Sequence, residues 1–128
     1  MFLWEQWSID FDNRMPIYRQ IIHHISQAFV RGDIKPGERI PSIRDISVLL
    51  KVNTNTIQRV YQEMERTGLI CSKRGTGYFF TEDKNMAEKT RKELMQDSIS
   101  QFLAEMHALC CKDREIFDEL KSFTGGKT

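Results

Sequence analysis

Residues 41–81 read PSIRDISVLLKVNTNTIQRVYQEMERTGLICSKRGTGYFFT, a run in which two short helical patterns are followed by a hairpin pattern. Ser42 begins a capping box, and the apolar residues after it recur at helical spacing, so we predict a helix over 42–50. Asn53 can cap a second helix, which Gly68 ends. Two helices joined so closely indicate a helix-turn-helix.

The segments around this pair predict that the helix-turn-helix is winged. Residues 69–72 and 77–81 read as strands, and the turn between them is basic and contains glycine. Before the pair, Pro16 suits a first helical position and Gly32 supplies a left-handed stop. These signals predict a further helix over 16–31.

Two weaker patterns complete the predicted organisation. Alternating apolar and polar residues over 7–11 predict a short, half-buried strand. After Thr81 about ten polar residues read as a linker that leads into a helix. We therefore predict an α+β fold, with a winged helix-turn-helix DNA-binding domain over 1–81 and a short α-helical dimerisation tail over 82–128.

The tail carries two apolar stripes. The first follows a heptad-like spacing, and the second belongs to a short helix that begins near Asp113. Two such helices cannot bury their apolar faces alone, so we predict that the chain forms a homodimer. The residues predicted to make this contact are Met95, Ile99, Phe102, Met106, Leu109, Ile116, Phe117 and Leu120.

The distribution of charged and apolar residues along the chain bears on the partner and the location of the protein. The net charge is only +1, yet residues 39–81 hold seven basic against three acidic side chains, and residues 82–128 hold eight against ten. A locally basic segment suits a polyanionic partner or a solvated face. The sequence contains neither a secretion signal nor a long apolar run, so we expect a cytoplasmic protein with no membrane partner.

The polar residues of the predicted motif have the chemistry of a DNA contact. Asn55 and Gln58 carry amides that can pair with adenine at two points, and Arg44 and Arg59 can reach phosphate or guanine. Lys73 and Arg74 in the hairpin turn suit the DNA backbone or the minor groove. Double-stranded DNA is the predicted partner, and a winged-helix protein-interaction module is the alternative.

The segments PGERIPSIRD, VNTNTIQRVYQEME and GTGYF within residues 36–81 resemble the DNA-binding domain of the GntR family of bacterial regulators. The short tail is similar to the dimerisation tail of its YtrA-like branch. The resemblance implies a dimer on a palindromic operator, usually repressing genes that often encode membrane transporters. Many relatives outside this branch have arginine where this chain has Thr54 and Gln58, so their base preferences do not carry over. The DNA contacts that the resemblance implies are Arg44, Thr54, Asn55, Thr56, Gln58, Arg74 and Gly75.

A thiol or metal response is a further alternative. His107 and Cys111 are four residues apart, with Cys110 beside them, so a nitrogen and a thiolate could share one metal ion. No fourth ligand is evident in the sequence. In the alternative interpretation, Cys110 packs in the dimer seam and His107 and Cys111 are exposed. We therefore expect no metal and no cofactor. The sequence has none of the common catalytic motifs, so we expect that the protein is not an enzyme. It does not decide whether a small-molecule effector binds.

Overall fold

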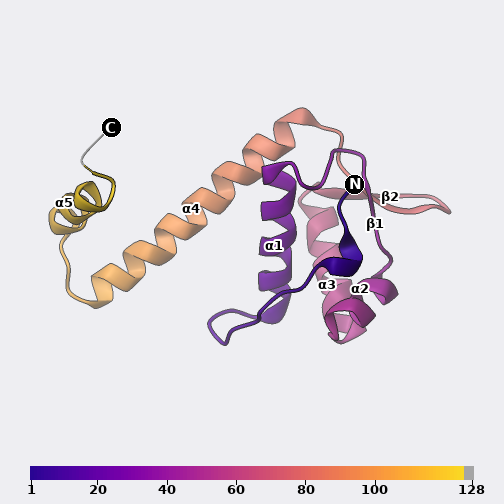
Figure 1. Cartoon of the computed structure of the whole chain (residues 1–128), viewed down its shortest axis with the longest axis horizontal. Coiled ribbons are helices and arrows are strands. Elements are labelled where there is room, and N and C mark those ends of the chain that lie inside the picture. The colour runs from indigo at the N-terminus through magenta and orange to yellow at the C-terminus, as the bar shows by residue number, and fades with distance from the viewer. Residues whose placement is uncertain (126–128) are drawn as a thin grey trace. The chain divides into compact units, whose positions relative to one another are not determined.

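Three helices and a small antiparallel sheet make up the N-terminal part of the chain in a computed structural model that describes residues 1–125 (Figure 1). The helices are α1 (Ile17–Arg31), α2 (Ile43–Leu50) and α3 (Thr54–Arg66), and the strands are β1 (Arg39–Ile40), β2 (Ile70–Lys73) and β3 (Gly77–Phe80). The strand order is β1-β3-β2. The predicted α+β winged helix-turn-helix is confirmed.

Local capping chemistry sets the helix ends where the sequence predicts them. The Ser42 hydroxyl accepts a hydrogen bond from the backbone N–H of Asp45 at 3.1 Å, and the Asn53 side-chain oxygen accepts one from Asn55 N–H at 2.7 Å. Each bond satisfies an amide that the first helical turn leaves without a partner. Gly32 ends α1 in the left-handed region, with φ of 85°.

Tyr61 joins the core to the loop that enters α2. Its side chain is buried among the apolar residues of the helices and sheet, and its hydroxyl donates a hydrogen bond to the Pro41 carbonyl. Its ring meets the Tyr78 ring edge-on, with centroids 5.2 Å apart. Burial, and then the nearby Asp45 carboxylate, raise the pKa of Tyr61, so the phenol stays protonated and keeps its donor.

The strand predicted over 7–11 is wrong. A short 3-10 helix, η1 (Trp4–Gln6), precedes these residues, and they belong to no strand. Burial nevertheless alternates along them, because Trp7, Ile9 and Phe11 pack against the core while the residues between them are exposed. The alternating pattern reports burial correctly, but no neighbouring strand supplies a ladder of hydrogen bonds.

The polar linker predicted after Thr81 is also wrong, because α4 (Lys84–Ala108) begins almost at once. The Asp83 carboxylate accepts a hydrogen bond from the Asn85 N–H at 2.9 Å, and Met86 packs against the core. The polar run is therefore the exposed side of a helix. A first compact unit ends at Lys92 within α4, whereas the predicted domain boundary follows Thr81.

The second compact unit begins at Glu93 and contains the rest of α4 and α5 (Asp113–Phe123). Cys110 lies between the two helices with φ of 62°, a left-handed conformation that few residues other than glycine adopt. Among the described residues, no helix is long and apolar enough to cross a membrane.

Replacing Tyr61 by phenylalanine should lower the free energy of unfolding by about 1–3 kcal/mol, because the half-buried Pro41 carbonyl loses its donor. Urea denaturation followed by circular dichroism measures this loss. Tyr78→Phe is the matched control, since it keeps the ring contact with Tyr61. Equal unfolding midpoints for Tyr61→Phe and the parent would contradict the role assigned to this hydrogen bond.

Candidate nucleic-acid interface

The predicted base-reading residues lie together at the N-terminal end of α3. Thr54, Asn55 and Gln58 are exposed there, and Thr56 is half-buried. The opposite side of the helix is buried in the core through Ile57, Val60, Tyr61 and Met64. This division leaves hydroxyl and amide groups free of the core, where they can reach base edges in a major groove.

Arg44 lies exposed in the first turn of α2, two residues after the Ser42 cap. Figure 1 shows α2 and α3 side by side in the first unit, and the two helices are in direct contact. Arg44 therefore belongs to the same helix-turn-helix as the polar end of α3. An exposed guanidinium beside a recognition helix suits a phosphate oxygen or a guanine edge.

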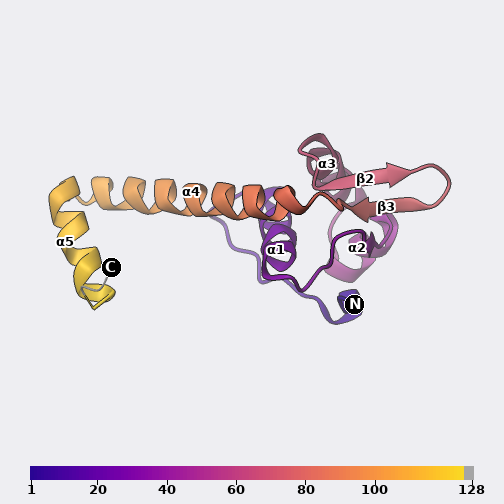
Figure 2. The ribbon, with the colours of Figure 1, turned by 90° about the horizontal axis from the view of Figure 1, so that it is seen from above.

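The β2–β3 hairpin projects away from the helices as a wing (Figure 2). Its turn is closed by Thr76, whose backbone N–H and hydroxyl both bond to the Lys73 carbonyl, at 2.9 and 3.0 Å. Gly75 adopts φ of 77°, which a side chain would oppose. Arg74 and Gly75 are exposed at the tip.

Lys73 and Arg39 occupy positions that the sequence did not predict. The Lys73 ammonium lies over the Phe79 ring, 4.6 Å from its centroid, instead of extending from the tip. Arg39 was not predicted as a contact, yet it is exposed on β1 and its guanidinium lies beside Gly77 of the wing. The only signal was a basic residue in an extended segment, which does not show where its side chain goes.

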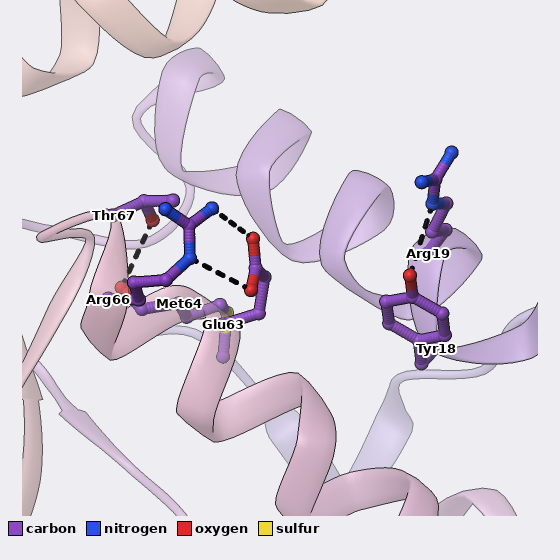
Figure 3. Close-up of polar contacts among 6 residues, drawn as sticks. All are labelled: Tyr18, Arg19, Glu63, Met64, Arg66 and Thr67. Atoms are coloured by element: carbon purple, nitrogen blue, oxygen red, sulfur yellow. Dashed lines mark hydrogen bonds and ion pairs between the residues drawn. The ribbon is translucent and has the colours of Figure 1, made fainter.

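Arg59 leans toward α1 instead of standing free on α3. Its guanidinium carbon lies 3.8 Å from the centroid of the Tyr18 ring, a cation–π contact. The Tyr18 hydroxyl accepts a hydrogen bond from Arg19 Nε at 3.2 Å (Figure 3). The ring holds the Arg59 guanidinium at the edge of the recognition helix, and Arg59 stays exposed.

At the C-terminal end of α3, the charged side chains have partners within the protein. Arg66 and Glu63 form two hydrogen bonds, of which the one between Arg66 Nε and Glu63 Oε2 measures 3.1 Å (Figure 3). The hydrogen bonds from Arg66, together with its charge, lower the pKa of Glu63. Glu65 accepts a hydrogen bond from the Ser72 hydroxyl at 3.0 Å. Of the basic side chains counted in the sequence, Arg66 is therefore already paired.

Most of the predicted dimer residues are exposed in the single chain. Met95, Ile99, Leu109, Phe117 and Leu120 are exposed, and Phe102 and Met106 are half-buried. Ile116 is only 4% exposed, so it already contributes to the packing of the second unit. Phe123, which the sequence places on the same apolar face of α5, is 85% exposed.

His107, Cys110 and Cys111, the candidate thiol or metal group, lie where α4 ends and the turn to α5 begins. His107 Nε2 lies 2.7 Å from Asp113 Oδ1, across the turn between α4 and α5. Desolvation, and then the Glu115 carboxylate, raise the pKa of the Cys111 thiol, which disfavours the reactive thiolate. Within residues 1–125, no three or more histidine, cysteine or acidic side chains are grouped to hold a metal ion.

Comparison with known proteins gives a consistent result. Residues 17–80 match the bacterial regulatory proteins of the gntR family. The HTH-type transcriptional regulator YhcF of Bacillus subtilis is 36% identical over 116 residues, which cover 91% of this chain and 96% of that protein. The HTH-type transcriptional repressor YtrA of the same organism is 28% identical over 124 residues, with coverage of 93% and 95%.

A solved structure, of a GntR family transcriptional regulator from Listeria monocytogenes, resembles this fold with a TM-score of 0.73. The two chains are 37% identical, and the match covers 88% of this chain and 98% of that one. These similarities therefore extend beyond the winged helix into the tail.

Removal of the Asn53 cap should lower the free energy of unfolding by about 1 kcal/mol, because Asn53→Ala leaves the Asn55 N–H at the start of α3 without its acceptor. Thermal unfolding followed by circular dichroism would detect this change. Asn55→Ala is the matched control, since it removes an exposed amide and keeps the cap, and it should cost no stability. A loss confined to the control would refute the capping assignment.

Proposed function

This chain belongs to the GntR family of bacterial regulatory proteins, and we propose that it is a repressor that binds a palindromic operator as a homodimer. Members of the family are DNA-binding transcription regulators and not enzymes. The proposal rests mainly on one observation, the exposed polar end of α3 beside Arg44 and the basic wing. The proposed place of action is the cytoplasm, where bacterial DNA lies.

In the proposed complex, α3 enters the major groove with its N-terminal end. Thr54, Asn55, Thr56 and Gln58 meet base edges there, and the amides of Asn55 and Gln58 are suited to adenine. These contacts select the sequence, because each base pair presents its own pattern of donors and acceptors in this groove.

The cations of the first unit fix the position of the protein on the duplex. Arg44 and Arg59 contact the strands beside α3, and Arg74 with Gly75 reaches the neighbouring backbone or minor groove. These contacts supply affinity that depends on salt but carries little sequence information.

A homodimer accounts for the exposed apolar residues of α4 and α5. Large apolar side chains such as Ile99 and Phe117 are 50% and 60% exposed in the single chain, and a second copy would remove them from water. A two-fold dimer presents two recognition helices to two half-sites, which matches a palindromic operator. Occupation of such a site beside a promoter blocks RNA polymerase.

Binding to the intergenic DNA upstream of its own gene tests the DNA-binding function. The purified protein should bind one site specifically against scrambled duplex. Arg44→Ala should weaken this binding by about 1–3 kcal/mol, because it removes an exposed cation beside α3. Arg31→Ala is the control, since Arg31 is already paired with Asp33 at 3.0 Å. Binding that never distinguishes operator from scrambled DNA, at that site or across a genomic fragment library, would exclude the proposed regulator.

Charge placed in the apolar stripes should separate the dimer. The double variant Ile99→Asp and Phe117→Asp should sediment as a monomer and bind a palindromic site much more weakly, because carboxylates resist desolvation at an apolar contact. Gln101→Asp is the matched control, since Gln101 is an exposed polar residue of α4 outside the predicted seam. A double variant that still sediments as a dimer would place the interface elsewhere.

A further inference from the structure

The three-stranded sheet has an outer face that contains two cations. Arg39 and Cys71 are the cross-strand partners of Phe79, and Lys73 is the partner of Gly77. Partners in an antiparallel pair share a face, as do alternate residues of one strand, so these five residues form one face. The neighbouring residues Ile40, Ile70 and Phe80 are buried on the other side of the sheet.

The position of Arg39 depends on a glycine. A Cβ at Gly77 would lie 3.3 Å from Arg39 Nη2 and 3.4 Å from Nε, and Gly77 has φ of 111°. A side chain at this position would be strained and would crowd the guanidinium. The strand partner of Arg39 is Phe79, and Gly77 is two residues nearer the turn, so the guanidinium is directed toward the tip of the wing.

The second cation is oriented by an aromatic ring. The Lys73 ammonium lies 4.6 Å from the centroid of Phe79, whose ring is half-buried between the two basic residues. A cation over a ring face keeps its charge while it loses rotamer freedom. The outer face of the wing therefore presents two positioned cations instead of two freely moving ones.

Neither cation is neutralised by a neighbouring acid. Within residues 1–125, the ion pairs involve other basic residues and leave Arg39 and Lys73 without a carboxylate partner. The acid next to Arg39 in sequence is Glu38, whose carboxylate accepts hydrogen bonds from the Phe2 and Lys35 N–H groups, each at 3.1 Å. The outer face thus keeps two positive charges for an external anion.

We infer that the outer face of the wing binds the DNA backbone, with Arg39 and Lys73 contacting phosphates beside the groove that receives the tip. This inference rests on the proposed DNA-binding function. It adds Arg39, which the sequence did not predict, to the wing contact predicted for Lys73, Arg74 and Gly75. Phosphate is the favoured partner because a guanidinium and an ammonium both bind its oxygens strongly. The Arg39 guanidinium is directed toward the same tip that carries Arg74, so both charges can face one backbone.

The salt dependence of operator binding tests this assignment. Each lost phosphate contact should reduce the slope of log K against log salt by about 0.9, so Arg39→Gln should reduce it by one such step and Arg39→Gln with Lys73→Gln by two. Arg39→Lys should keep most of the slope. Arg31→Gln removes the same charge from an arginine already paired with Asp33, and it should leave the slope unchanged.

Phosphate ethylation interference supplies a second readout that a change in stability would not move. Ethylation of the DNA phosphates beside the wing should block binding of the parent protein. Binding of the double variant should become insensitive to ethylation at those phosphates alone. An unchanged slope and footprint in a double variant that binds specifically would overturn the outer-face contact and leave the proposed function intact. A parent protein that shows no salt-dependent duplex binding would overturn both.

Discussion

The hydrogen bond from the Tyr61 hydroxyl to the Pro41 carbonyl constrains the whole DNA-binding unit. A buried phenol needs an acceptor, and the one that it finds lies directly before the Ser42 cap of α2. The same ring touches Tyr78 of β3. Tyr61 of the recognition helix α3 therefore links α3 to two other elements. One is the start of α2, which carries Arg44, and the other is β3, the strand that leads out of the wing.

The sequence predicted those parts of the fold that depend on local chemistry. The bounds of α1, α2 and α3 agree with the prediction to within a residue or so, because caps at Ser42 and Asn53 act on amides nearby in the chain. The strand over 7–11 and the polar linker after Thr81 were wrong for a common reason. Both patterns describe which side chains face water, and neither specifies the backbone that presents them.

The sequence predicted which residues form the candidate site better than it predicted the direction of their side chains. The exposed polar end of α3 follows from its apolar stripe, which the spacing of Ile57, Val60 and Met64 reveals. The direction of a long cationic side chain depends instead on residues distant in sequence. Arg59 is set by Tyr18 and Arg39 by Gly77, and neither pairing leaves a trace in a local pattern.

The aromatic cluster at the N-terminus has an optical consequence. The chain has two tryptophans, Trp4 and Trp7, whose ring centroids are 5.4 Å apart, and Trp4 stacks on Phe80 at the end of β3. All three tyrosines also lie before residue 82. Tryptophan and tyrosine fluorescence therefore originates in the winged-helix part alone, because the aromatic rings of the tail are those of three phenylalanines, which emit only weakly. Emission and far-ultraviolet dichroism, recorded on one sample, can separate the melting of the two units without any added label.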